Sequence, residues 1–303
     1  MLNKIFPSKF TRRIHVNISL KCFSTTNEKN PLVKYELISQ NKDIGLLTIS
    51  NSHKRNALSL EVLNAIISEL EKINKGFKEI NTPRVIIINS DGPVFSSGHD
   101  LKELYSFSDE LRKESFEKCS EMMIAIEKLN SIVIAEVQGL ATAAGCQLAA
   151  TCDLVVASSK AKFETPGVRI GLFCSTPSVA LARAISQKRA MHMLVTGNQI
   201  SAKTAHDWGL VNEVVEVEES DSFDQQREKL RQGSLKLAEH INSFSGAALS
   251  FGKRTFYSQL SRSKIEEAYN IAGKAMCQNI NFADTKEGIS AFIQKRKPVF
   301  NKH

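Results

Sequence analysis

Residues 139–153 read GLATAAGCQLAATCD, and this stretch indicates how the chain around it folds. It follows the apolar segment SIVIAEVQ, which has the composition of a buried strand, and its own second half has the composition of a helix. The turn between them consists of small residues, which leave backbone N–H groups open to a ligand at the positive end of a helix dipole. Strand, bare turn and helix in this order predict a ligand site in an α/β fold.

The residue one turn into this helix is Gln147, at a position where a reacting acid or base is expected. An amide side chain exchanges no useful proton near neutral pH. The residues alone therefore leave three interpretations open: a reaction site, a former reaction site, or a tight turn that binds nothing.

Another loop of the same design comes earlier in the chain, after RVIIINS at residues 84–90. It is called here the first loop, and the turn within residues 139–153 is called the second loop. The first loop's sequence FSSGHDL places Gly98 and His99 at the start of a helix, as residues 139–153 place Ala144 and Gly145. Two backbone N–H groups at helix starts can hold one anionic oxygen, which is how an oxyanion hole stabilises an enolate or a tetrahedral intermediate. A single glycine-rich turn is weak evidence, and the pair favours a functional site.

Secondary-structure patterns alternate along the chain. VKYELIS and IGLLTIS predict a hairpin, residues 59–74 and about 109–129 predict helices, and three apolar segments, RVIIINS, SIVIAEVQG and DLVVASS, predict buried strands. From about residue 178 the patterns are helical. We therefore predict an α/β core at 33–215 and a helical C-terminal part at 216–303. Glu136 is unusual inside a buried strand, and we interpret it as facing solvent or another subunit.

Residues 1–23, MLNKIFPSKFTRRIHVNISLKCF, differ from the rest of the chain in charge. They hold five Lys or Arg and no acid, so they account for five of the positive charges in a net charge of +8. A basic, hydroxylated and mildly amphipathic segment without a long apolar core is typical of a mitochondrial transit peptide, and a disordered basic tail is the alternative. We expect a location in the mitochondrial matrix.

The composition argues against several other classes of protein. With 303 residues, 42% of them hydrophobic and 24% charged, the chain has the balance of a soluble globular protein, and no apolar run has the length of a membrane span. The basic residues beyond the leader form no patch with interleaved aromatics, so we expect no nucleic-acid partner. The six cysteines form no CxxC pair and no ligand spacing with histidine, so we expect neither a zinc site nor a disulfide framework.

Several motifs together resemble the crotonase (enoyl-CoA hydratase/isomerase) superfamily. They are KRNALS, GPVFSSGHDLKEL, QGLATAAGCQLAATCD, FETPGVRIGL, TGNQISAKTAHDWGLVNEVV and GISAFIQKRKPVF, which occur in the family's order over roughly residues 33–300. The resemblance implies the crotonase (ClpP-like) spiral fold of ββα units, with C-terminal helices that build a trimer or a hexamer. It also implies an acyl-CoA thioester as ligand, with coenzyme A as part of that ligand and no tightly bound cofactor or metal.

The resemblance assigns the oxyanion hole to the backbone amides of His99 and Ala144. Family hydratases use two glutamates as base and acid. The matching positions in this chain are Gln147 and Gly167, so both carboxylates are absent. The ligand site is thus expected to lack its usual proton-transfer groups.

The resemblance further assigns contacts with coenzyme A and the acyl group. They fall on two segments near the first loop and on one near the C-terminus: Lys54, Arg55 and Ala57; Ser97, His99, Asp100, Leu101 and Lys102; Phe292 and Lys295. The last pair reaches the adenine and the 3′-phosphate bound to a neighbouring subunit. The alternatives are a solvated basic turn at Lys54, a charge at the start of a helix at Asp100, and surface charge near the C-terminus.

Two functions therefore remain open. The first is an enzyme of fatty acyl-CoA metabolism, namely an enolate-forming lyase, isomerase or thioesterase that uses a base other than the two glutamates. The second is a CoA-thioester-binding or regulatory protein of lipid metabolism without turnover.

Overall fold

Parallel strands form the larger of two sheets in the computed structural model, which describes residues 31–39, 43–75 and 82–301. The predicted leader at residues 1–23 lies outside them. This sheet, here called sheet A, has the strand order β1-β2-β3-β5-β7-β10. Its strands are β1 Val33–Leu37, β2 Ile44–Ile49, β3 Val85–Ser90, β5 Ile132–Val137, β7 Leu154–Ser158 and β10 Glu213–Val215. Only the β1–β2 pair is antiparallel, as predicted for a hairpin.

A smaller sheet, sheet B, runs through the short strands β4 Val94–Ser96, β6 Leu140–Thr142, β8 Lys162–Glu164 and β9 Ile200–Ser201. The strands β3, β5 and β7 of sheet A are each followed directly by a strand of sheet B. The chain therefore winds as a spiral that adds one strand to each sheet per turn. Because strands of two or three residues are too short to show a period, the residue pattern alone did not reveal sheet B.

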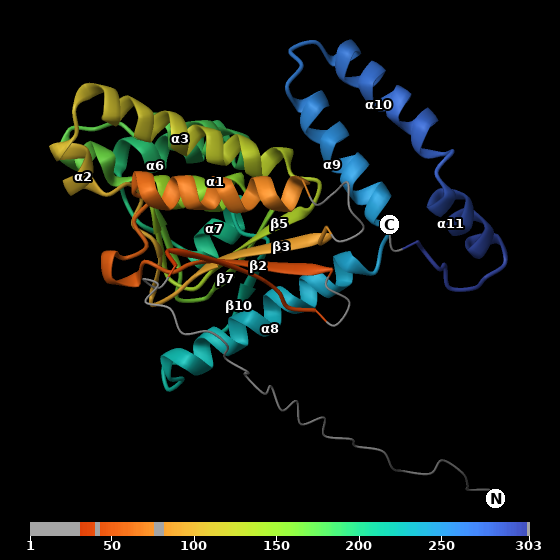
Figure 1. The fold of residues 1–303 in the computed structure, drawn as a ribbon, viewed down its shortest axis with the longest axis horizontal. Coiled ribbons are helices and arrows are strands. Elements are labelled where there is room, and N and C mark those ends of the chain that lie inside the picture. The colour runs from red at the N-terminus through yellow and green to blue at the C-terminus, as the bar shows by residue number, and fades with distance from the viewer. Residues whose placement is uncertain (1–30, 40–42, 76–81, 302–303) are drawn as a thin grey trace, which may run out of the picture. The chain divides into compact units, whose positions relative to one another are not determined.

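The central strands of sheet A are buried on both faces, as their apolar sequences predicted. Along β3, Ile86 and Ile88 belong to the main core, whereas Val85 and Ile87 belong to a second apolar cluster on the opposite face. Helices α1 Leu60–Lys75, α3 Asp109–Lys128 and α4 Ala144–Thr151 contribute to the main core, and α8 Phe223–Asn242 covers the second cluster. Figure 1 shows α1 and α3 on one side of β2 and β3, with α8 on the other.

The predicted helices lie close to their expected positions. The hydroxyl of Ser59 accepts a hydrogen bond from the Val62 N–H at 3.3 Å, so Ser59 caps α1 as predicted. The remaining helices of the second half are α5 Ser175–Ala184, α6 Gln187–Thr196, α7 Ala202–Trp208, α9 Gly246–Leu260, α10 Ile265–Asn279 and α11 Ala283–Ile293. Helix α9 contacts both α10 and α11 and also touches β5 of sheet A.

Glu136 corrects one expectation. Its side chain is only 5% exposed, and it faces neither solvent nor an open surface. It accepts a hydrogen bond from the Arg231 guanidinium of α8 at 2.9 Å, which makes a buried ion pair between sheet A and its covering helix. Burial raises the pKa of Glu136, and the Arg231 charge opposes that rise.

Candidate functional site

The two predicted loops meet at Gly98, which lies between β4 and the short helix α2 (Leu101–Ser106). A Cβ atom added to Gly98 would lie 3.0 Å from the amide nitrogen of Ala144 and 3.0 Å from the Cβ of Ala143. Gly98 also has a φ of +76°, a conformation that L side chains rarely adopt. The missing side chain therefore allows the first loop to approach the backbone of the second.

The amides of His99 and Ala144 lie beside this contact. Within the described ranges, neither N–H group donates a hydrogen bond to another part of the protein. Ala144 is 1% exposed, so its free N–H is enclosed by protein. Two unpaired donors on adjacent loops form the kind of backbone arrangement that an oxyanion hole requires.

Ala143 shapes the turn in front of α4. Its φ of 51° and ψ of −117° lie outside the regions that residues with side chains prefer. Its N–H donates to the Glu164 carbonyl and its own carbonyl accepts from the Gln147 N–H, both at 3.0 Å. On the side facing β4, a Cβ at Gly145 would lie 2.4 Å from the Ser96 carbonyl oxygen. The turn is thus fixed by hydrogen bonds and by close backbone packing.

The Lys54 segment lies directly against the first loop. The Ser97 N–H donates to the Arg55 carbonyl at 3.0 Å, and the Leu58 N–H donates to the Gly98 carbonyl at 2.8 Å. The structure therefore brings two groups of predicted contact residues into one neighbourhood. Among the others, Ala57 is buried, whereas the Leu101 and Lys102 side chains are exposed.

Asp100 has a structural role in this loop. Its carboxylate accepts from the N–H groups of Lys102 and Glu103 at the start of α2, and it pairs with the Lys54 ammonium at 3.0 Å. Burial acts to raise the pKa of Asp100, but Lys54 and the two amides outweigh it and hold the pKa below its usual value. Asp100 is therefore an ionised helix cap, which agrees with the alternative stated above.

Asn56 organises the loop between Lys54 and Leu58, and the sequence analysis did not single it out. Its φ is 52°, and its side chain is fully buried. Its amide group donates to the carbonyls of Asp91 and Val94, both at 2.7 Å, and its amide oxygen accepts from the Asn51 N–H at 3.0 Å. A role of Asn56 in the turn could have been predicted, because asparagine tolerates a left-handed backbone and its side chain can hydrogen-bond to backbone groups in a turn.

Buried polar atoms without a protein partner concentrate around the two loops. Of the ten such side-chain atoms in the described part of the chain, five belong to four residues here: His99 Nδ1 and Nε2, Thr142 Oγ1, Gln147 Oε1 and Thr165 Oγ1. A buried polar atom left unpaired costs about 1–3 kcal/mol. So dense a group is expected where a polar ligand binds, because natural folds pair most of their buried polar atoms.

The imidazole of His99 packs against an aromatic side chain of α3. Its ring meets that of Phe116 edge to face, with the ring centroids 5.1 Å apart. Burial lowers the pKa of His99 below its ordinary value. The nearby Leu58 backbone acts to raise the pKa, although it does not form a hydrogen bond of good geometry with the ring. The neutral imidazole is therefore the favoured form at neutral pH.

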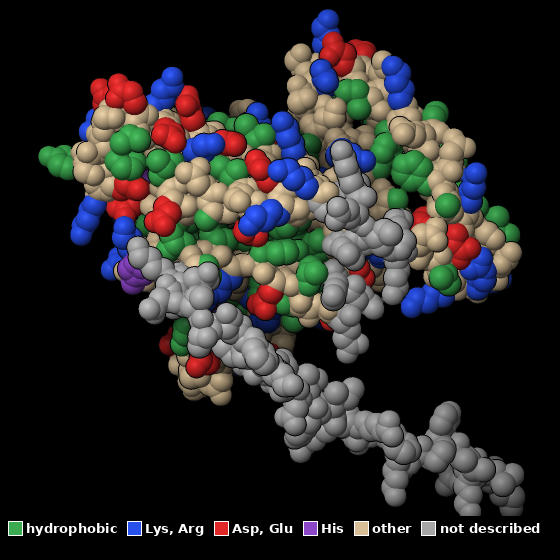
Figure 2. Space-filling model, viewed as in Figure 1, with side chains coloured by type: hydrophobic (Ala, Val, Ile, Leu, Met, Phe, Trp, Pro, Cys, Tyr) green, Lys and Arg blue, Asp and Glu red, His purple; other side chains and the backbone are tan. Residues whose placement is uncertain are grey.

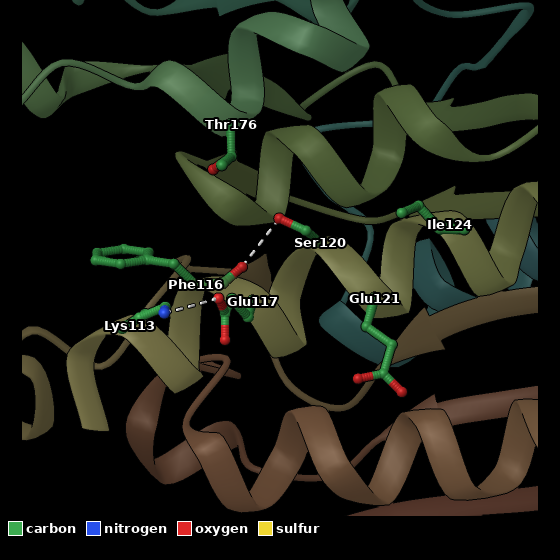
Figure 3. Close-up of a pocket in the computed structure, with 7 residues that line it drawn as sticks. All are labelled: Lys113, Phe116, Glu117, Ser120, Glu121, Ile124 and Thr176. Carbon is green, nitrogen blue, oxygen red and sulfur yellow. Dashed lines mark hydrogen bonds and ion pairs between the residues drawn. The ribbon is translucent and has the colours of Figure 1, made fainter. Parts of the chain in front are cut away.

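Phe116 also lines a pocket of about 640 Å³ between α3 and the start of α5, shown in Figure 3. Its other lining residues are Lys113, Glu117, Ser120, Glu121, Ile124 and Thr176. His99 thus contacts Phe116, one of the residues that line this shallow surface depression.

Charged side chains are mixed over the face seen in Figure 2, where basic and acidic groups alternate along the helices and do not form one basic patch. In the described ranges no cluster of three or more His, Cys, Asp or Glu has the arrangement of a metal site. No helix among the same residues is both long and apolar enough to cross a membrane.

Comparison with known proteins identifies the family. The sequence profile described as enoyl-CoA hydratase/isomerase matches residues 39–303. The chain belongs to the enoyl-CoA hydratase/isomerase family. The mouse (Mus musculus) protein named enoyl-CoA hydratase domain-containing protein 3, mitochondrial, is 45% identical over 263 residues, which cover 86% of this chain and 83% of that protein. Its human (Homo sapiens) counterpart is 46% identical over 256 residues, covering 84% and 80%.

Solved structures of the family confirm the predicted spiral fold. An enoyl-CoA hydratase from Mycobacterium smegmatis superimposes with a TM-score of 0.81 at 37% identity, covering 89% of this chain and 98% of that one. The human domain-containing protein 3 superimposes with a TM-score of 0.77 at 43% identity, covering 89% and 100%.

Gly167 occupies one of the two positions at which the enoyl-CoA hydratase/isomerase resemblance predicts a glutamate. A Cβ added there would lie 2.3 Å from the Leu172 carbonyl oxygen and 2.9 Å from the Cys174 sulfur. The Leu172 N–H donates to the Gly167 carbonyl at 3.0 Å, which closes this turn. Residue 167 therefore has no room for any side chain in the present loop conformation.

Phe292 and Lys295 lie apart from the loops within one chain. Phe292 is 85% exposed near the end of α11, and Lys295 is exposed just beyond it. Helix α11 contacts α9. The structure therefore does not bring these two residues to the site of their own subunit, and a role across an interface stays a prediction.

Proposed function

We propose that this protein binds an acyl-CoA thioester and polarises its carbonyl group between the backbone amides of His99 and Ala144. The observation that carries the proposal is the contact of Gly98 with the Ala144 backbone, beside two N–H groups that have no acceptor within the described protein. A thioester oxygen is the acceptor that such a pair stabilises when negative charge develops on it. Family membership supports an acyl-CoA as the molecule that carries this oxygen.

The Lys54 segment is proposed to bind the phosphate-bearing part of coenzyme A. Lys54 and Arg55 are both exposed, and their backbone lies against the first loop. Exposed cations beside the carbonyl site suit a polyanionic ligand. We also propose a mitochondrial location, which the names of the mouse and human relatives and the basic segment 1–23 support.

The reaction is proposed to be that of an enolate-forming lyase or isomerase, or of a thioesterase that acts through a tetrahedral intermediate, and not ordinary hydration. Gln147 and Gly167 offer no carboxylate, which also favours the second candidate, a CoA-thioester-binding or regulatory protein without turnover. Turnover of a panel of purified acyl-CoAs distinguishes the two candidates.

Butanoyl-CoA is expected to stabilise the protein against heating, whereas free butanoate is not. Ligand at a hundredfold excess over its Kd adds about 2.7 kcal/mol of stability, which is easily seen as a rise in Tm. The change Lys54→Glu or Arg55→Glu is expected to weaken butanoyl-CoA binding about tenfold, because each reverses a charge that faces the phosphates. Titration by thermal shift at low and high salt measures both effects, and salt should reduce the difference.

Lys203→Glu is the matched control for Lys54→Glu. Both lysines are exposed and each pairs with an aspartate, Lys203 with Asp207 at 2.9 Å. Equal weakening by both variants would show a general charge effect and remove the assignment at Lys54. No stabilisation by any acyl-CoA at about millimolar concentration would remove the proposed function itself.

Oligomerisation is proposed for the helices after α8. Several large apolar side chains there are at least half exposed, and a single chain leaves them uncovered: Phe256, Leu260, Ile265, Tyr269, Met276, Ile280, Phe292 and Ile293. An exposed apolar surface of this kind marks a contact with another protein surface. We propose a homotrimer or a hexamer in which Phe292 and Lys295 contact the coenzyme A bound to a neighbour.

Light scattering at micromolar concentration is expected to give the mass of a trimer or hexamer. Lys295→Glu should weaken butanoyl-CoA binding in a salt-sensitive manner and leave the mass unchanged. Lys297→Glu, two residues away and also exposed, is the control and should leave the affinity unchanged. A monomer would contradict the assembly, and a normal oligomer with unchanged affinity in Lys295→Glu would contradict only the role of Lys295.

A further inference from the structure

The imidazole of His99 is attached to the residue whose backbone amide is proposed to hold the thioester oxygen. Covalent geometry keeps the ring nitrogens of a histidine within roughly 3–6 Å of its own backbone nitrogen in the common rotamers. A carbonyl oxygen bound at this amide is therefore held by the same residue that carries the ring. Both ring nitrogens are buried and have no partner at hydrogen-bonding geometry in the described protein, although the Leu58 backbone approaches the ring.

Three other unpaired buried polar atoms lie close to the backbone of Ala143, which directly precedes Ala144. Thr142 directly precedes Ala143, Gln147 donates its N–H to the Ala143 carbonyl, and Thr165 follows the residue whose carbonyl accepts from the Ala143 N–H. Gln147 is 4% exposed, and Thr165 is fully buried. His99 is the member of this group that titrates near neutral pH, because amides and hydroxyls do not.

The other titratable groups around the two loops already have roles. The Asp100 carboxylate caps α2 and pairs with Lys54, and the Glu103 carboxylate accepts from the Leu60 N–H at 3.2 Å. The Glu164 carboxylate faces the Arg169 guanidinium at 4.0 Å. Burial raises the pKa of the Cys146 thiol to about 12 and also raises that of Cys174, so neither thiol carries a reactive negative charge near neutral pH.

In the described part of the chain the His99 ring has no acidic hydrogen-bond partner, and no neighbouring charge shifts its pKa. Phe116 covers it from α3, and the Leu58 backbone approaches it from the segment before α1. On α3 the charged residues nearest to Phe116 in sequence are Glu114, Glu117 and Lys118. Glu114 is exposed, Glu117 faces the Lys113 ammonium at 3.7 Å, and Lys118 pairs with Glu121 at 2.7 Å. Burial therefore decides the protonation state, and it lowers the pKa of His99.

We infer that the His99 imidazole is the proton-transfer group of this site, removing a proton from the α-carbon of the bound thioester and returning it. In this step the α-carbon–hydrogen bond breaks and the proton moves to a neutral ring nitrogen. The electron pair of that bond forms the carbon–carbon double bond of an enolate, and the carbonyl π electrons move to the oxygen held by the His99 and Ala144 amides. Reversal restores the thioester, and no oxidant or co-reactant is consumed.

The inference rests on the proposed function, and exchange of α-hydrogen in heavy water tests it separately from binding. The full-length protein is incubated with butanoyl-CoA in D₂O, and deuterium at the α-carbon is measured by mass spectrometry. His99→Gln is expected to lower the exchange rate about 10²–10⁴-fold, because it removes one well-placed base. The backbone amide of residue 99 remains in this variant, so the Kd for butanoyl-CoA should change little.

The pH profile of exchange adds a readout that a merely structural role of His99 does not affect. The pKa of His99 is lowered, so the neutral base predominates above its ordinary pKa of 6.5. The exchange rate should be level above that value and fall as the pH drops through the lowered pKa. His99→Ala should lose this profile, and free imidazole added to that variant should restore part of the rate through the space that the ring leaves.

His206→Ala serves as the control, because His206 is exposed on α7 and belongs to no part of the site. Its exchange rate should equal that of the unaltered protein. Undiminished exchange in His99→Gln, or butanoyl-CoA binding without any exchange in the unaltered protein, overturns the role of His99 and leaves the proposed function in place. Failure to bind butanoyl-CoA overturns the proposed function, and with it the inference.

Discussion

Crotonyl-CoA is expected to be hydrated by this protein at a rate about 10⁴-fold or more below that of a hydratase with both glutamates. Each well-placed acid or base contributes about 10²–10⁴-fold, and Gln147 and Gly167 stand at both positions. His99 supplies one titratable group, whereas addition of water needs a base for the water and an acid for the α-carbon. Loss of absorbance of the conjugated thioester measures the rate.

The control for this measurement is binding of butanoyl-CoA by the same preparation, which shows that the site is folded. Gln147→Glu alone should not produce a hydratase, because the second carboxylate is still missing. A rate within about a hundredfold of an ordinary hydratase would contradict the expectation and would mean that another residue transfers protons to and from water.

The double variant Gln147→Glu with Gly167→Glu tests a structural limit. Residue 147 accepts a carboxylate of nearly the same shape, but a Cβ at residue 167 would lie 2.3 Å from the Leu172 carbonyl oxygen. A side chain at 167 therefore requires the turn between Gly167 and Cys174 to open. We expect this variant to lose stability without gaining hydration, so the loss of the glutamates is not repaired by two substitutions.

Asp153→Ala is expected to be the most destabilising of the substitutions considered, at about 3–5 kcal/mol, because it leaves a buried cation without its partner. The Lys253 side chain on α9 is 2% exposed, and its ammonium pairs with the Asp153 carboxylate at 2.6 Å. Lys253 also donates to the carbonyls of Ile126 and Ser131 at 3.2 and 2.9 Å. The same carboxylate accepts from the Tyr257 hydroxyl at 2.8 Å.

The midpoint of urea unfolding, measured at one fixed protein concentration, tests this expectation. Lys253→Met should cost less than Asp153→Ala, because it removes the cation and leaves the aspartate paired with Tyr257. Asp207→Ala, which breaks the exposed pair with Lys203, is the control and should leave the midpoint unchanged. If Asp153→Ala behaves like this control, the buried pair contributes nothing to the attachment of α9.

Much of the fold could be predicted because its helices carry an apolar period and its buried strands are continuous apolar runs. β3 and β5 were predicted as strands buried on both faces, and the structure places their alternate residues in two separate apolar clusters. Sheet B could not be predicted from the residue pattern, because its strands have only two or three residues. The partner of Glu136 was equally hidden, since Arg231 lies on a helix that returns to sheet A much later in the chain.

The positions of the candidate site residues could be predicted from the sequence, whereas the contacts that hold them in place mostly could not. The resemblance identified His99 and Ala144, and the structure brings their loops together through Gly98. Their roles toward a thioester remain predictions. The partners of Asn56 and Phe116 could not be predicted from the sequence. Asn56 donates to backbone carbonyls, and Phe116 packs on the His99 ring, which comes from a separate loop. Such roles depend on tertiary contacts, which a residue pattern does not contain.

The use of backbone donors affects how such a site can change during evolution. Every residue except proline brings an N–H group, so a substitution at residue 99 keeps the backbone donor that is proposed to hold the thioester oxygen. The positions least tolerant of a side chain are Gly98, with a φ of +76° and a close approach to Ala144, and Gly145, where an added Cβ would lie 2.4 Å from the Ser96 carbonyl oxygen. If the proposed oxyanion hole is correct, residue 99 can therefore change its side chain, and with it the chemistry beside the bound oxygen, while the backbone donors stay in place.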